Sequence, residues 1–109
     1  MPDFFKRDIV VGEVEYWATI GKVAKLSGVL RAGASPDDAD PDGYSALHGA
    51  AENGHLDCVR ALLAAGAEPH PRTDDGLTPL DLAEMEGHDE IAKLLDQFPD
   101  PRVPSGLAD

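Results

Sequence analysis

Apolar residues recur at helical spacing along the chain, and glycines interrupt the pattern. In the segment 56–64, Cys58, Val59, Leu62 and Leu63 lie on one helix face, and Gly66 ends the stripe. Comparable stripes occur in the segments 13–20, 23–30 and 91–95. Because each stripe is short and a glycine separates it from the next, the pattern predicts pairs of short helices that turn back on themselves, in an all-α chain.

The pattern repeats with a fixed period. Several glycine-containing positions recur 33 residues further along the chain. The matching positions are Gly33-Ala34 with Gly66-Ala67, Gly43 with Gly76, and Gly54-His55 with Gly87-His88. A regular period of this length is typical of proteins built from stacked helical repeats.

Each repeat carries its own signals for helix start and reversal. Ser45 and Thr78 stand where a helix begins, and each can accept a hydrogen bond from a backbone N–H of the first turn. Pro79 follows Thr78 at the first helical position, where its missing N–H costs nothing. Gly54 and Gly87 fall between two helical patterns, where the backbone must reverse. These signals predict a helix-turn-helix unit.

The chain resembles the ankyrin repeat, in which D-x-x-G leads to T-P-L-H-x-A-A, then x-x-G-H, an apolar helix and G-A. The matching residues of the first clear unit are Asp40, Gly43, Ser45, Leu47, His48, Ala50, Ala51, Gly54, His55, Leu62, Leu63, Gly66 and Ala67. Those of the second are Gly76, Thr78, Pro79, Leu80, Leu82, Ala83, Gly87, His88, Ile91, Leu94 and Leu95. The resemblance implies an all-α ankyrin-repeat solenoid of about three helix-turn-helix units, with projecting β-turn or hairpin loops.

The organisation expected from this resemblance is a single domain over residues 1–98. Residues 13–33 form a degenerate N-terminal repeat, residues 40–66 the central repeat and residues 73–98 the C-terminal repeat. Residues 1–12 match no repeat element, but their apolar content predicts that they fold back onto the first helix pair. Residues 99–109, rich in proline, are expected to form a flexible tail.

The net charge of −12 constrains the partner. Nucleic acid and anionic lipid would be repelled, so a basic protein surface is the natural complement. A single cysteine, Cys58, allows no internal disulfide and suits a reducing cytoplasm, where we expect the protein. We expect neither a signal peptide nor a membrane-spanning stretch.

Candidate chemistry is limited. Ser45 and His48 are spaced as a Ser-His pair on one helical turn, which makes a hydrolase the remote alternative. The helix-cap interpretation, with His48 bonded back into the turn, explains both residues and their place in the repeat, and Asp81 replaces His48 in the next unit. The histidines show no metal-ligand spacing, and His70 is expected to be solvated. Pro41 interrupts the only calcium-like acidic run, so neither metal nor cofactor is expected.

The resemblance implies a non-catalytic protein-binding module that contacts partners through the projecting turns and the exposed side of each first helix. Carried onto this sequence, the contact residues are Pro41, Asp42, Tyr44, Glu52, Asn53, Asp74, Asp75, Leu77, Met85 and Glu86. Apolar side chains within a ring of carboxylates suit a protein interface. Basic residues fall instead on the second helices, at Lys22, Lys25, Arg31 and Arg60. We therefore expect a negative turn-bearing face, in a monomer or a hetero-complex. Alternatives are an immunity- or antitoxin-type inhibitor of a basic toxin or nuclease, and a structural end module of a larger complex.

Overall fold

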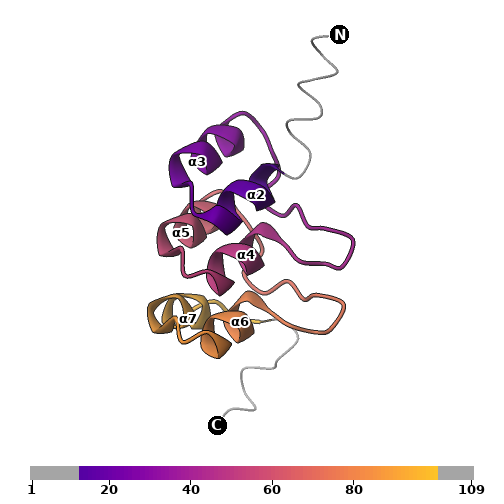
Figure 1. The fold of residues 1–109 in the computed structure, drawn as a ribbon, viewed down its shortest axis with the longest axis vertical. Helices are drawn as coiled ribbons and strands as arrows, with labels where there is room; N and C mark the ends of the chain where they lie inside the picture. The colour runs from indigo at the N-terminus through magenta and orange to yellow at the C-terminus, as the bar shows by residue number, and fades with distance from the viewer. Residues whose placement is uncertain (1–12, 101–109) are drawn as a thin grey trace.

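The computed structural model describes residues 13–100, which form antiparallel helix pairs stacked along one axis (Figure 1). The helices are α2 (Glu13–Ile20), α3 (Val23–Arg31), α4 (Ala46–Glu52), α5 (Leu56–Ala64), α6 (Pro79–Met85) and α7 (Asp89–Asp96). Within this range the β-type pairing is confined to one isolated antiparallel bridge between Ala39 and Ser45. The predicted all-α ankyrin-type solenoid of helix pairs is therefore confirmed.

The predicted helix starts are also confirmed. Ser45 precedes α4 with an extended backbone, and its side chain accepts from the His48 backbone N–H. Thr78 precedes α6 and accepts from the Asp81 N–H, while Pro79 occupies the first turn. In both cases the third helical residue returns a bond to the capping residue, so the two orphan donors at each helix start are satisfied reciprocally.

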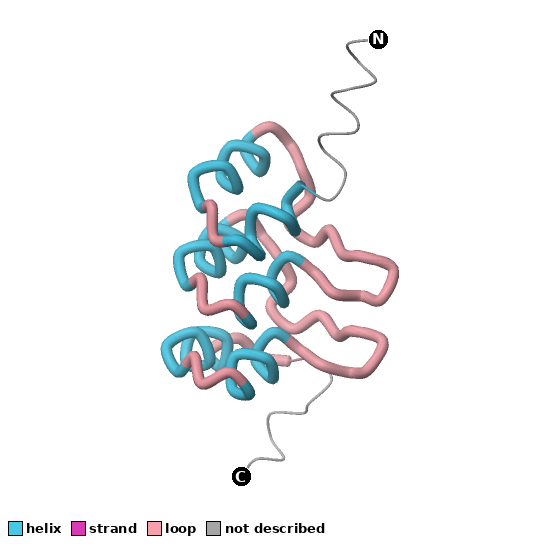
Figure 2. Tube along the Cα trace, viewed as in Figure 1, coloured by secondary structure: helices cyan, strands magenta, loops and turns pink. Residues whose placement is uncertain are grey.

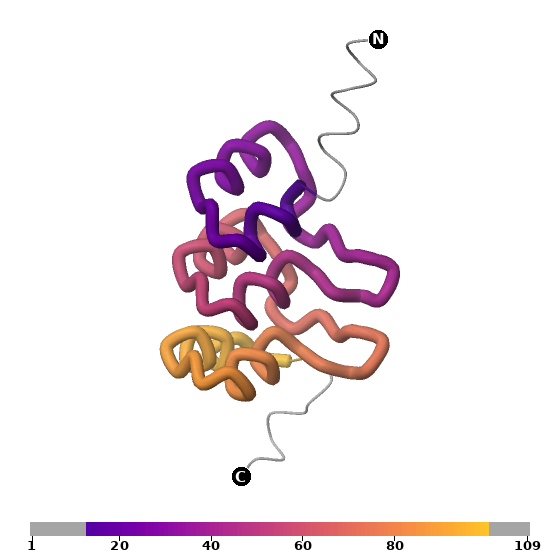
Figure 3. The backbone as a smooth tube through the Cα atoms, viewed as in Figure 1, coloured from indigo at the N-terminus to yellow at the C-terminus, as the bar shows by residue number. Residues whose placement is uncertain are grey.

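The turns between successive pairs project from one side of the stack. Figure 2 shows these loops extending away from the helices in the same direction, and Figure 3 shows the chain passing from each loop into the next pair. Two of the loops contain equivalent turns, in which Gly43 N–H donates to Asp40 O at 2.9 Å and Gly76 N–H to Thr73 O at 2.8 Å. The predicted projecting turns therefore share one geometry.

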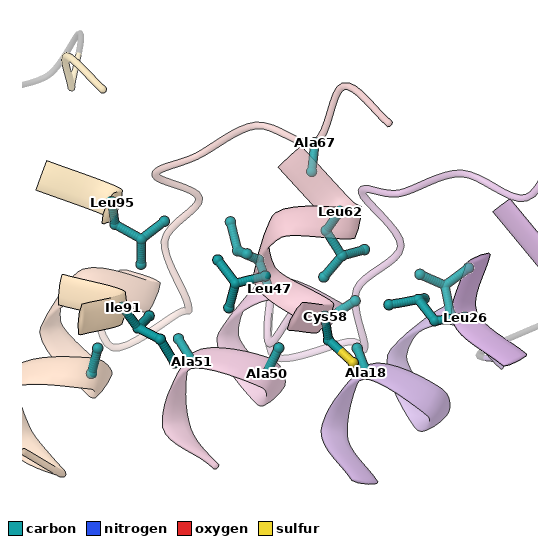
Figure 4. Packing of buried hydrophobic residues seen from close by; sticks show 14 residues of the cluster. Ala18, Leu26, Leu47, Ala50, Ala51, Cys58, Leu62, Ala67, Ile91 and Leu95 are labelled. Atoms are coloured by element: carbon teal, nitrogen blue, oxygen red, sulfur yellow. The ribbon is translucent and has the colours of Figure 1, made fainter. Parts of the chain in front are cut away.

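The core runs continuously through the stack (Figure 4). Leucines of the second helices fill it, including Leu26, Leu62 and Leu95, each fully buried. Small residues of the first helices, such as Ala18 and Ala50, allow these helices to approach closely. Each pair buries its apolar side against a neighbouring pair, so a single pair would leave that side in water.

Histidines join successive pairs. The His55 ring packs against Gly21 of the preceding pair, and the His88 ring packs against Gly54. The Nε2 atom of His88 lies 3.1 Å from the Glu52 carbonyl oxygen, and that of His48 lies 2.7 Å from the Leu77 carbonyl oxygen. The stack is thus held by polar contacts between repeats as well as by apolar packing.

The expectation that residues 1–12 fold back onto the first helix pair lies outside the described residues. The same holds for residues 101–109 of the expected flexible tail. Of the proline-rich end, Pro99 and Asp100 are described, and Asp100 forms an ion pair with Arg72 at 3.2 Å.

The expectation that His70 is solvated is wrong: it is 3% exposed, and its Nε2 lies 2.6 Å from the Phe98 carbonyl oxygen. The residues that follow the last helix therefore contact the loop that precedes the last pair.

Candidate functional site

The first projecting turn is organised by one carboxylate. Asp40 Oδ1 accepts the backbone N–H groups of Asp42 at 2.9 Å and Tyr44 at 3.0 Å. In the second turn the Thr73 hydroxyl occupies the equivalent position and accepts the Leu77 backbone N–H at 3.2 Å. Short polar side chains are suited to this task because they bond to backbone groups a few residues away.

The two turns are joined at their ends. The Asp74 N–H donates to the Asp42 carbonyl oxygen at 2.9 Å. A Cβ placed on Gly43, where φ is +81°, would lie 3.1 Å from the Arg72 carbonyl oxygen and 3.2 Å from the Thr73 Cα. Glycine therefore permits the close approach of the turns, and the hydrogen bond joins their backbones.

An open groove of about 640 Å³ lies between these turns and the first helices. It combines carboxylates with apolar side chains. Its lining residues are Asp40, Asp42, Tyr44, Glu52, Thr73, Asp74, Asp75, Leu77 and Leu82. We call this the acidic groove.

Tyr44 is held in place within the acidic groove. Its hydroxyl donates to Glu52 Oε1, and its ring stacks on that of His48, with 5.5 Å between centroids and 26° between planes. Partial burial raises the pKa of Tyr44, and the bond to the Glu52 carboxylate raises it further. The hydroxyl therefore stays protonated as a donor, and the ring keeps one orientation.

The negative charge of this face has no internal counterion in the part of the chain that the structure describes. The ion pair found there, Arg72 with Asp100, does not involve the groove. Partial burial and then the nearby Asp40 and Asp38 carboxylates raise the pKa of Glu15, on α2. The carboxylates of the turn and of the first helix therefore repel one another.

The four basic residues named from the sequence lie on or next to second helices, as predicted, whereas Arg72 lies in the loop of the second turn and donates to the Gly76 carbonyl oxygen. Lys25 and Arg31 are exposed on α3, Arg60 is exposed on α5, and Lys22 directly precedes α3. The second helices thus carry these cations while the groove carries carboxylates. Asp57, Asp89 and Glu90 are also exposed on the second helices, so that side of the stack carries mixed charge.

Of the predicted contact residues, the groove brings together Asp42, Tyr44, Glu52, Asp74, Asp75 and Leu77. The remaining four lie outside its lining: Pro41, Asn53, Met85 and Glu86. All four are exposed, Met85 to 66%. Sequence reasoning missed three lining residues, Asp40, Thr73 and Leu82. The 33-residue offset between Asp40 and Thr73 was the available signal, since equivalent positions of neighbouring turns lie side by side.

The Ser45 and His48 pair has the geometry of a helix cap. Nδ1 of His48 lies 2.8 Å from Ser45 Oγ and accepts the Ser45 backbone N–H at 3.0 Å, so its Nε2–H donates to Leu77. Both residues are buried, at 3% and 0% exposure. Burial also lowers the pKa of His48, an effect that the bond to Leu77 partly offsets. A nucleophile needs access to substrate, so the capping interpretation accounts for this pair and the hydrolase alternative gains no support.

Across residues 13–100, no three His, Cys, Asp or Glu side chains are grouped so that they could hold a metal ion. None of the helices in this range is long and apolar enough to cross a bilayer.

Comparison with known proteins agrees with the stacked pairs and projecting turns. A family model of three ankyrin repeats matches residues 18–103. The chain belongs to the ankyrin-repeat family. Ankyrin repeats generally mediate protein–protein interaction and are typically non-catalytic.

A curated ankyrin-containing relative supports the same assignment over a shorter stretch. The chain is 51% identical over 47 residues to cortactin-binding protein 2 of Neofelis nebulosa. The match covers 42% of this ankyrin-repeat chain but only 3% of the relative.

Proposed function

We propose that this ankyrin-repeat protein binds a basic partner protein through its turn-bearing face, with the acidic groove at the centre of the contact. The observation that carries the proposal is the groove itself: carboxylates from two joined turns and from α4 surround Tyr44, Leu77 and Leu82. Apolar side chains supply the buried area of an interface, and the charged rim selects the partner and speeds its approach.

The electrostatics of the free protein support a basic partner. The net charge is −12, and the groove carboxylates lack an ion-pair partner within residues 13–100. A cationic surface placed there would gain Coulomb energy with these carboxylates in a partly desolvated site. Partners of the same sign would meet a barrier instead.

The contact surface extends beyond the groove in this proposal. Asn53, Met85 and Glu86 continue the exposed side of the first helices, and Pro41 lies beside Asp42 at the end of the first turn. The name of the Neofelis nebulosa relative describes binding of another protein, which fits an interaction role for the shared repeats. The protein acts as a monomer or within a hetero-complex, and its buried lone thiol suits the cytoplasm.

A narrower version of this proposal is an inhibitor that covers the basic active site of a toxin or nuclease, in the manner of an immunity protein or antitoxin. The acidity of the chain favours it. In this version the partner loses activity when bound, whereas an adaptor leaves it active. An activity assay of any partner that co-purifies therefore separates the two.

The test is capture of proteins from the native cell extract on the immobilised chain. One variant combines Asp42→Asn, Asp74→Asn and Asp75→Asn, whose side chains are exposed at the turns. A matched control removes equal charge from exposed positions outside the groove and away from the first helices, with Glu68→Gln, Glu90→Gln and Asp96→Asn. The captured proteins are expected to be basic, to remain on the control and to be lost on the turn variant and at about 0.5 M salt. Capture that survives both the turn variant and high salt removes the electrostatic basis of the proposal, and indicates a structural end module instead.

A further inference from the structure

We infer that the acidic groove binds an arginine side chain of the partner in preference to a lysine, with the guanidinium lying over the Tyr44 ring and forking to carboxylates of the turns and of α4. This inference rests on the proposed function and specifies its chemistry. Three properties of the groove carry it: a fixed aromatic face, carboxylates on two turns and on α4, and partial burial.

The aromatic face is preorganised. His48 is fully buried and covers one side of the Tyr44 ring, and the hydroxyl is tied to Glu52. His48 is itself fixed at both ring nitrogens, by Ser45 and by Leu77. Tyr44 lines the groove, so a ligand there contacts a ring that does not need to be ordered on binding. Planar guanidinium groups stack on such rings, and an ammonium group gains less from this geometry.

The carboxylates come from separate elements around the ring. Asp42 lies on the first turn, Asp74 and Asp75 lie on the second, and Glu52 lies on α4. A guanidinium has five N–H donors in a rigid fork and can bond to two of these groups at once. An ammonium is a compact point charge, so it satisfies the same set less completely.

Partial burial favours the same choice. Tyr44, Glu52 and Leu77 are each partly buried, and Leu82 is 6% exposed. A cation that enters this groove must lose part of its water shell. Guanidinium is more weakly hydrated than ammonium, so it loses less on entry.

The experiment titrates the full chain, labelled with ¹⁵N, with two end-blocked peptides that alternate glycine with arginine or with lysine at the same places, at about 50 mM salt. The arginine peptide is expected to bind about fivefold to tenfold more tightly. Its side-chain methylene protons should move upfield in the ring current of Tyr44. The backbone signals of Tyr44, Leu77 and Asp75 should shift, while those of α7 stay in place.

Variants then test the ring. Tyr44→Leu should bring the arginine peptide down to the affinity of the lysine peptide, and Tyr44→Phe should keep the preference because the ring remains. Glu84 does not line the groove, so Glu84→Gln should leave the affinities for the arginine and lysine peptides unchanged. If Tyr44→Leu does not fold, the upfield shift in the wild-type protein decides the question alone.

The outcomes test the arginine preference separately from the acidic surface that binds a basic partner. Equal affinity for the two peptides, with strong salt dependence and shifts at the groove, overturns the arginine preference and leaves the acidic surface intact. Absence of binding by either peptide overturns both. An arginine preference that persists in Tyr44→Leu shows that the carboxylates alone produce it, and overturns the role of the ring.

Discussion

Gly54 lies where the α4–α5 pair meets the α6–α7 pair, and its substitution tests the packing between the two pairs. This residue has φ +78° in the turn between α4 and α5, a conformation that side chains disfavour. A Cβ added there would lie 2.8 Å from Cε1 of His88 and 3.1 Å from its Nε2. Gly54→Ala therefore strains the backbone and also displaces the ring that bonds to Glu52.

Gly87 supplies the matched control. Its φ is +76°, nearly the same, yet a Cβ added there meets nothing within 4 Å. Left-handed backbone costs a residue with a Cβ about 1 to 2 kcal/mol at either position. Gly54→Ala also loses the hydrogen bond from His88 to Glu52, which costs about a further 0.5 to 1.5 kcal/mol. The two substitutions should differ by about 1 kcal/mol in the free energy of unfolding.

Urea titration followed by far-UV circular dichroism measures this difference. In thermal melts it corresponds to a gap of about 4 to 8 °C between the two variants. A second background sharpens the test: once His88→Ala has removed the ring, Gly54→Ala and Gly87→Ala should carry equal penalties. Equal penalties in the wild-type background would refute the contact between repeats as the cause.

Three further outcomes follow from buried side chains. Leu62→Ala should lower the free energy of unfolding by about 2 to 5 kcal/mol, measured by urea titration, because Leu62 is fully buried between neighbouring pairs. His48 has a lowered pKa, so the unfolded chain takes up its proton first; stability should fall as pH drops below about 6.5, and His48→Gln should remove that part of the pH dependence of the urea midpoint. Burial, and then the nearby Asp57 carboxylate, raises the pKa of Cys58 to about 11. A thiol reagent at about pH 8 should therefore modify the native chain far more slowly than the urea-unfolded chain.

The helices were predictable because their signals are local. The apolar spacing, the caps at Ser45 and Thr78 and the reversals at Gly54 and Gly87 each depend on residues within a few positions of one another. The fixed period then implied that equivalent helices lie side by side. For this reason the sequence predicted the segment 13–20 as a helix although that unit lacks the usual starting motif, and α2 spans Glu13–Ile20.

The contacts between repeats were not predictable in the same way. The bond from His48 to Leu77 spans 29 residues of sequence, and that from His70 to Phe98 spans 28. Nothing in the composition of a single turn indicates which carbonyl oxygen will face it from the next repeat. The same limit explains why Leu82 was missed in the acidic groove, since it lies on a helix of the following unit and enters the groove only when the units are stacked.

The exchange of His48 for Asp81 has a consequence for how the stack can be lengthened. The imidazole at position 48 donates from Nε2 to the next unit, whereas the Asp81 carboxylate only accepts, and it is already engaged by the Thr78 N–H at 3.0 Å. A further unit grafted after α7 would find no donor at that place and would need to bring one of its own. Protein engineers who wish to extend this scaffold should therefore restore histidine at position 81 before adding anything beyond it.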